Sequence, residues 1–157
     1  LFVRFDQLTT LAPMLPLACA AARFQPVYVG DVADAFVRAL GDKTTFGKRY
    51  DLGGPSVMSL QEIVAYTLRQ RGRWRLVLPL GAGLSRVMAE VLEHLPGKPF
   101  SRDNLRSASL NSVLAAGHDG LRELNIPKTP VSAIVPAYLG QRGVLARYDR
   151  LRERAGR

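Results

Sequence analysis

The chain has 157 residues, 47% of them hydrophobic, which suffices for one domain with a core and excludes a disordered chain. Lys and Arg outnumber Asp and Glu by 22 to 13, and the net charge of +9 favours an anionic partner such as phosphate, nucleic acid, membrane or acidic protein.

The single cysteine, Cys19, excludes an intramolecular disulfide and indicates a reducing compartment. The longest apolar run, residues 11–22, contains two prolines and falls short of the roughly 20 residues that span a membrane. The sequence does not begin with Met, and we expect a fragment of a longer protein.

The first elements are a short helical segment and a strand followed by a helix. Residues 3–11 predict one or two helical turns, which an extended, proline-containing connection follows. Residues 26–29 predict a short buried strand, and residues 31–40 predict a helix. We expect Asp31 to cap that helix in a structural and not a catalytic role, with Asp34 adding negative charge near its start.

One face of this helix is apolar. Val32, Phe36 and Leu40 recur at helical spacing, so this face is expected to lie against a sheet. The strands of that sheet are expected mostly before residue 1. We therefore predict that a partner chain or a rearranged core covers the face.

A second strand and a well-marked helix come next. Residues 49–52 predict a strand, and the glycines at 53–54 predict a turn that reverses the backbone. Ser59 and Glu62 have the spacing of a capping box, which predicts a helix that starts there and ends at Gly72.

The remaining elements are mostly helical. Residues 74–78 alternate in polarity and predict a third strand, and residues 84–95 form the clearest amphipathic helix of the sequence. Shorter helices are predicted at 101–108 and 121–124. A last helix is predicted after Thr129, over residues 130–139.

No motif indicates chemistry of its own. The glycines in residues 81–86 lack the third glycine of a dinucleotide-binding turn and are expected to start a helix. His94 and His118 have no Cys, Asp or Glu at ligand spacing, so no metal site is predicted. No nucleophile elbow and no nucleic-acid-binding motif is found, and nucleic acid is not the expected partner.

Residues 142–157 form a basic amphipathic tail. Two interpretations stay open: a solvated terminal helix, or docking to an anionic membrane surface or a membrane-associated partner.

Five segments together resemble a known family. The segments are FQPVYVGDVADAFVRAL (24–40), RYDLGG (49–54), SLQEIVAYTL (59–68), LPLGAGLSRVMAEVLEHLPGKPFSRDNLRSASLNSV (78–113) and LNIPKTPVSAIVPAYL (124–139). They resemble the C-terminal portion of extended and atypical short-chain dehydrogenases/reductases, the NAD-dependent epimerase/dehydratase-like group, and most of all the branch with the NAD(P)H-binding accessory subunit of complex I.

The resemblance implies an α/β fold, the C-terminal portion of a Rossmann-like NAD(P)-binding fold with few, mostly parallel strands and several helices. Residues 1–140 would be the substrate-lobe portion and residues 141–157 the tail. NAD(P) would be held by the N-terminal Rossmann part of the same protein, and none is expected to bind this chain tightly.

The family's catalytic pair, Tyr-x-x-x-Lys, is absent. Tyr66 is followed four residues later by Gln70, and Tyr138 by Arg142. We therefore predict no catalytic, cofactor-binding or metal-binding residue in this chain.

Two departures from the family pattern bear on the substrate. The arginine that meets a sugar-nucleotide diphosphate corresponds to Phe24, one place from Arg23, and Gly30 replaces the first acid of the usual V-D-D pattern. The residues placed nearest a substrate cleft are Arg4, Arg23, Gln25 and Tyr28.

Three functions are expected as alternatives. The resemblance implies either a lobe that closes the cofactor and substrate cleft of a complex I accessory-subunit-like protein, or a nucleotide-sugar epimerase or dehydratase. The basic tail instead suggests a non-catalytic interaction or assembly module that docks to a membrane-associated partner. A homo-oligomer is a further expected partner, and the expected location is cytoplasmic with peripheral contact at the inner membrane.

Overall fold

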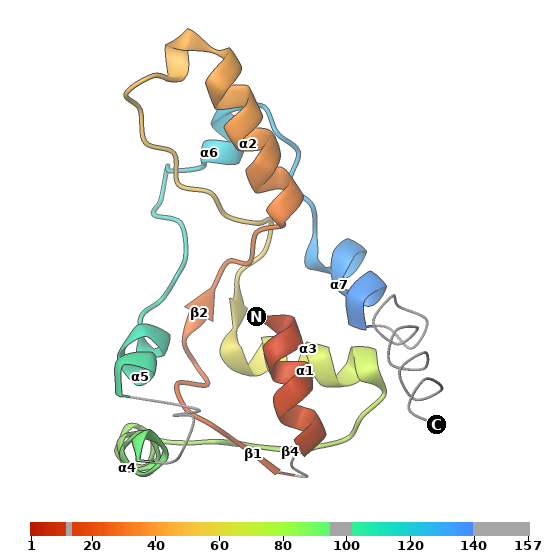
Figure 1. The fold of residues 1–157 in the computed structure, drawn as a ribbon, viewed down its shortest axis with the longest axis vertical. Helices are drawn as coiled ribbons and strands as arrows, with labels where there is room; N and C mark the ends of the chain where they lie inside the picture. The colour runs from red at the N-terminus through yellow and green to blue at the C-terminus, as the bar shows by residue number, and fades with distance from the viewer. Residues whose placement is uncertain (12–13, 95–101, 140–157) are drawn as a thin grey trace.

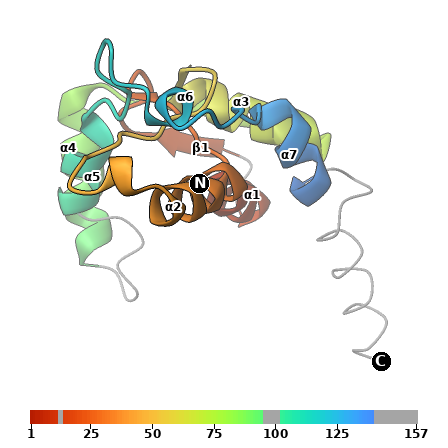
Figure 2. The same ribbon diagram turned by 90° about the horizontal axis from the view of Figure 1, so that it is seen from above.

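The computed structural model describes residues 1–11, 14–94 and 102–139, which form a mixed α/β fold. Figure 1 shows α2 and α6 at one end of the long axis and the β1–β4 pair at the other; Figure 2 shows α4 and α5 on one flank and α7 on the opposite flank. The helices are α1 (Phe2–Leu11), α2 (Val29–Gly41), α3 (Leu60–Arg71), α4 (Ala82–Glu93), α5 (Arg102–Ser109), α6 (Gly120–Glu123) and α7 (Val131–Leu139), with a 3-10 turn η1 (Lys43–Thr45).

Two small sheets connect distant segments. β1 (Met14–Leu17) pairs in parallel with β4 (Leu76–Pro79), and β2 (Arg23–Phe24) pairs antiparallel with β3 (Met58–Ser59). The strand predicted at 74–78 is confirmed with a shift of two residues at its start. Its partner strand, β1, comes from the proline-containing stretch after the first helix, which was expected to be an extended connection.

The main core lies between the β1–β4 pair and helices α1 and α3 (Figure 1). β1 buries alternate residues, as expected of a strand with one covered face. The buried members of this core are Leu15, Leu17, Ala20, Leu60, Val64 and Leu68.

A charged cluster fixes α1 to the end of α3. Asp6 is only 6% exposed, and its carboxylate accepts hydrogen bonds from both Arg71 and Arg73. The Nε of Arg71 lies 2.6 Å from Oδ1 of Asp6, and Nη1 of Arg73 lies 3.1 Å from the same oxygen. Two guanidinium groups thus compensate the burial of one carboxylate.

Helix α3 has the ends that its sequence predicts. The Ser59 hydroxyl accepts from the Glu62 N–H at 3.2 Å, and the Glu62 carboxylate accepts from the Ser59 N–H at 2.7 Å. Gly72 ends the helix in the left-handed conformation with φ 60°. The predicted capping box and helix end are confirmed.

The predicted strand at 26–29 is wrong. The N–H of Gln25 donates to the Ser112 carbonyl at 2.9 Å, and the N–H of Ser112 donates to the Arg23 carbonyl at 2.7 Å. Pro26 has no N–H to continue this pairing, and α2 begins at Val29. The pairing therefore stops where the strand was expected to start.

The strand predicted at 49–52 is also wrong. Tyr50 and Leu52 pack against a second small core around Ala35 and Leu121, and the Asp51 carbonyl accepts from the Gly120 N–H at 2.9 Å. No strand of the described chain runs alongside this segment, so it crosses the second core as an extended loop.

The glycines that follow serve close packing, and the predicted backbone reversal is wrong. Neither Gly53 nor Gly54 has a positive φ. A Cβ on Gly54 would lie 1.9 Å from the Pro26 carbonyl oxygen, and one on Gly53 would lie 2.7 Å from Leu114. Both positions require glycine because other segments pass too close for a side chain.

Asp31 does not cap α2 as expected. It is the third residue of the helix, and Tyr28 at the N-cap position makes no side-chain cap. The Asp31 carboxylate accepts from the N–H and from the hydroxyl of Thr129, both at 2.7 Å. Asp31 is 5% exposed and holds the segment before α7 against the start of α2.

Most of the expected buried face of α2 is turned away from the rest of the described chain, while Val32 at its start is half-buried. The side of α2 that contains Ala35 packs against Leu121 and Leu124. On the outward side, Phe36 is 66% exposed and Leu40 is 78% exposed. That a partner or another part of the protein covers this face stays a prediction. Helix α4 repeats the pattern, with exposed Leu84, Val87 and Val91 and buried Ser85 and Ala89.

Among the described residues, no helix is long and apolar enough to cross a membrane. The basic tail lies outside the residues that the structure describes.

Asp31→Asn should lower the free energy of unfolding by about 2 kcal/mol, since the buried side chain loses its charge and one of the two oxygens that accept from Thr129. Urea unfolding of the variant measures the change. Asp34→Asn, at an exposed position of the same helix, is the matched control and should change stability little. Equal stability of both variants would contradict the role given to Asp31.

Asp119 should make stability depend on pH. A hydrogen bond from Lys128, at 2.7 Å, lowers the pKa of the Asp119 carboxyl below its usual range. As the pH falls, the Asp119 carboxylate therefore becomes protonated in the unfolded chain before it does so in the folded chain. The stabilisation of the fold by this carboxylate is present above about pH 4 and is lost as the pH falls through the folded pKa. In Asp119→Asn, the free energy of unfolding should fall less steeply as the pH is lowered below about 4 than it does in the unsubstituted chain. An equally steep fall in both would contradict this role of Asp119.

Candidate functional site

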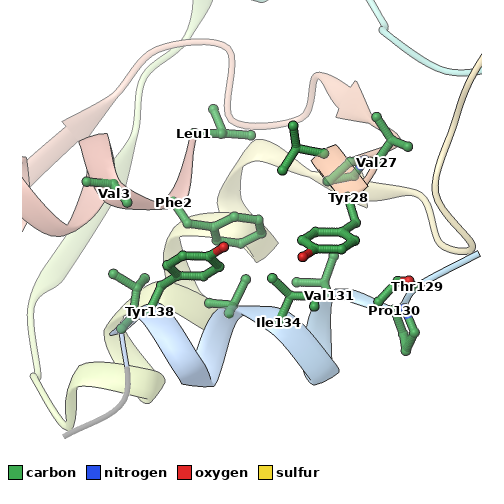
Figure 3. Close-up of a pocket in the computed structure, with 14 residues that line it drawn as sticks. Leu1, Phe2, Val3, Val27, Tyr28, Thr129, Pro130, Val131, Ile134 and Tyr138 are labelled. Atoms are coloured by element: carbon green, nitrogen blue, oxygen red, sulfur yellow. The ribbon is translucent and has the colours of Figure 1, made fainter. Parts of the chain in front are cut away.

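An apolar pocket lies between the start of α1, the segment before α2, and α7 (Figure 3). Its volume is about 280 Å³, and its walls come from residues 1–3, 26–29 and 129–139. No Asp, Glu, Lys, Arg or His is among the described residues that line it. This composition suits binding of an apolar molecule and not acid–base chemistry.

Contacts between distant segments hold these walls. Asp31 ties Thr129, at the start of the α7 wall, to the first turn of α2. On the other side, the Phe2 ring meets the Tyr66 ring of α3 edge-on, with centroids 6.1 Å apart and planes at 70°. The pocket is therefore held by contacts to both α2 and α3.

Gly30 sets the place of the Tyr28 ring. A Cβ on Gly30 would lie 2.3 Å from a ring carbon of Tyr28, so only glycine lets the ring rest against the first turn of α2. This position is where the chain departs from the acidic residue of the family pattern. The departure thus has a structural consequence at the pocket.

Two tyrosine hydroxyls face the same space. In Figure 3, Tyr28 enters from the segment before α2 and Tyr138 from α7, with their hydroxyl ends turned toward each other beside the Phe2 ring. Within the described part of the chain, neither hydroxyl makes a hydrogen bond to the protein, and both stay open to solvent, with Tyr138 44% exposed. The pocket thus offers two unengaged polar atoms in apolar surroundings.

The sequence-predicted cleft residues do not come together. Tyr28 lines the pocket, whereas Arg4 is exposed on α1 and Arg23 is exposed on β2. Gln25 is engaged elsewhere: its amide donates to the Gly54 carbonyl at 2.8 Å and accepts from the Leu114 N–H at 3.0 Å.

Sequence reasoning missed the contribution of α7. The sequence predicted the helix but no part in a site; Val135 and Leu139 are buried, and these two residues, Ile134 and Tyr138 all border the pocket. No signal in the sequence could have placed Tyr138, because tertiary packing decides which side of α7 is covered.

Other titratable groups lie away from the pocket. Burial raises the pKa of the Cys19 thiol, which lowers its reactivity. His94 bonds the Glu90 carbonyl one turn back at 2.7 Å. Across the described ranges, no three His, Cys, Asp or Glu side chains gather as a metal site would require.

Comparison with known proteins gives an extended match to a plant protein. The chain is 33% identical over 116 residues, 73% of its length, to a protein of Arabidopsis thaliana named NADH dehydrogenase (ubiquinone) 1 alpha subcomplex subunit 9, mitochondrial. The chain is homologous to a region of this complex I accessory subunit. The accessory subunit belongs to the epimerase/dehydratase-like short-chain dehydrogenase/reductase family, so the expected resemblance is confirmed.

A shorter match carries a different name. The chain is 35% identical over 69 residues to a protein of Oryza sativa subsp. japonica named Cyclin-B1-2, which covers 43% of the chain. The chain spans 29% of the length of the Arabidopsis protein and 18% of the rice protein. The chain matches no protein-family model.

Gly30→Ala should displace the Tyr28 ring, because the new methyl group would overlap it. The proton chemical shifts of the ring report the move. Gly41→Ala is the matched control at the other end of α2, where a Cβ meets nothing within 4 Å. Unchanged Tyr28 shifts in Gly30→Ala would contradict the packing described.

Proposed function

We propose that the chain is the C-terminal lobe of an NAD(P)-binding protein related to the complex I accessory subunit. In this role it closes one side of the cofactor and substrate cleft and leaves catalysis, if the parent has any, to other residues. The observation that carries the proposal is the exposed apolar face of α2, supported by the homology over 73% of the chain.

The orientation of α2 explains why this face needs another part of the protein. Asp31 and Ala35 fix one side of the helix to α6 and to the segment before α7. Phe36, Val37 and Leu40 consequently point outward, and burying each would contribute about 1.5–3 kcal/mol. An N-terminal Rossmann part of the same protein, with its sheet, fits this surface.

The binding of NAD(P) belongs to that N-terminal part in this proposal. The segments of this chain contain neither the glycine fingerprint nor the Tyr-x-x-x-Lys pair. The apolar pocket has no cation for a diphosphate, and this disfavours the nucleotide-sugar epimerase or dehydratase alternative for the chain's own residues.

A second candidate function is an assembly module. The exposed residues Leu84, Val87 and Val91 form a separate apolar face on α4, and the Arabidopsis relative is by its name a subunit of a larger enzyme. An anionic membrane surface, a membrane-associated partner and a homo-oligomer remain proposed partners of this kind. That relative is mitochondrial by name, and for this chain we keep peripheral contact at an inner membrane as the proposed location.

Calorimetric titration with NADH and NADPH should show binding to the full-length protein and none to the 157-residue chain. Phe36→Ser with Leu40→Ser, in the full-length protein, should weaken nucleotide binding because the lobe no longer packs. Leu110→Ser, at a similarly exposed apolar residue outside α2, is the control. A full-length protein that binds neither nucleotide would refute the proposal.

A further inference from the structure

The pocket of Figure 3 has a pattern of polarity that selects a ligand. Its walls are aliphatic and aromatic, and the two phenol hydroxyls of Tyr28 and Tyr138 are turned toward each other within it. The third hydroxyl of the lining, that of Thr129, already donates to Asp31 at 2.7 Å. Two hydroxyl donors are therefore left for a bound molecule.

We propose that this pocket binds a neutral, mainly apolar small molecule whose single carbonyl or hydroxyl oxygen sits between the hydroxyls of Tyr28 and Tyr138. The lining residues all belong to this chain, so the proposal goes beyond the function above and holds whether or not the parent binds NAD(P).

Charge excludes the other ligand classes. A carboxylate or phosphate would find no cationic side chain among the described lining residues, at a desolvation cost of several kcal/mol. A pure hydrocarbon would displace water from both phenols and leave each without a partner, which costs about 1–3 kcal/mol per group. A neutral molecule with one acceptor oxygen avoids both penalties.

Size narrows the class further. A volume of about 280 Å³ lies at the lower limit of small-molecule pockets. It suits a molecule of one or two rings or a short acyl chain, and it is too small and too apolar for a nucleotide. The ligand is thus a compact ketone, ester or alcohol.

The walls are positioned before any ligand arrives. Gly30 lets the Tyr28 ring rest on α2, and Asp31 holds the segment that leads into α7 and Tyr138. Positioning of both hydroxyls by the fold reduces the ordering cost of binding.

Three matched probes test the proposal on the full-length protein and on the 157-residue chain: methyl naphthyl ketone, isopropenylnaphthalene, which replaces the carbonyl oxygen by a methylene, and naphthoate. Titration followed by chemical shifts gives the affinities. The ketone should bind about 5-fold or more tightly than the hydrocarbon, as one to two neutral hydrogen bonds imply, and naphthoate should bind weakest.

Tyr28→Phe with Tyr138→Phe should remove this preference, and it should tighten hydrocarbon binding because no phenol is then left without a partner. Gly30→Ala, which displaces the Tyr28 ring, should reduce ketone affinity with both hydroxyls still present. Tyr50→Phe, at a tyrosine outside the pocket, is the control and should alter neither affinity.

The proposal is overturned by equal binding of ketone and hydrocarbon, by tightest binding of naphthoate, or by a ketone preference that survives the double Phe variant. Absence of all binding to the full-length protein would also overturn it, because upstream residues would then fill the pocket. The calorimetric titration with NADH and NADPH is a separate measurement. A negative result with the three probes therefore contradicts the pocket proposal alone and leaves the proposed closure of the cofactor cleft untouched.

Discussion

The pocket and the orientation of α2 depend on the hydrogen-bond pair between Asp31 and Thr129, which joins segments 98 residues apart in the sequence. Asp31 is buried, and its carboxylate has to find donors or bear the cost of desolvation. The backbone N–H and the hydroxyl of Thr129 meet that need together. This contact fixes the first turn of α2 against the segment that leads into α7, and so it sets both the pocket and the rotation of α2.

The rotation of α2 determines what the chain offers to the rest of a protein. With Asp31 and Ala35 turned toward α6 and the segment before α7, the more hydrophobic side of the helix points outward. Helix α4 likewise buries its small residues, Ser85 and Ala89, and exposes its larger ones. Such faces are features of a lobe that packs on further structure. The chain's contribution to function is therefore a set of surfaces and one apolar pocket, which fits homology to a region of a larger accessory subunit.

Local signals in the sequence predicted local structure well. The capping box at Ser59, the left-handed Gly72 and the helical periodicities gave α3, α4 and α7, because these features depend on residues only a few positions apart. Contacts between distant segments were beyond such reasoning. Asp31 has the pattern of a helix cap and bonds Thr129 instead, and β4 pairs with a proline-containing segment. Of the pocket, the sequence suggested Tyr28 alone; Tyr138 could not be placed because only tertiary packing decides which side of α7 is covered.

The central claim, that the outward face of α2 packs on another part of the same protein, can be tested through thiol accessibility. In a Cys19→Ser background, Phe36→Cys should react rapidly with a maleimide in the 157-residue chain and much more slowly in the full-length protein. Leu110→Cys serves as the reference and should react at the same rate in both. Equal, rapid reaction of the thiol at position 36 in both proteins would show that nothing covers this face and would contradict the account.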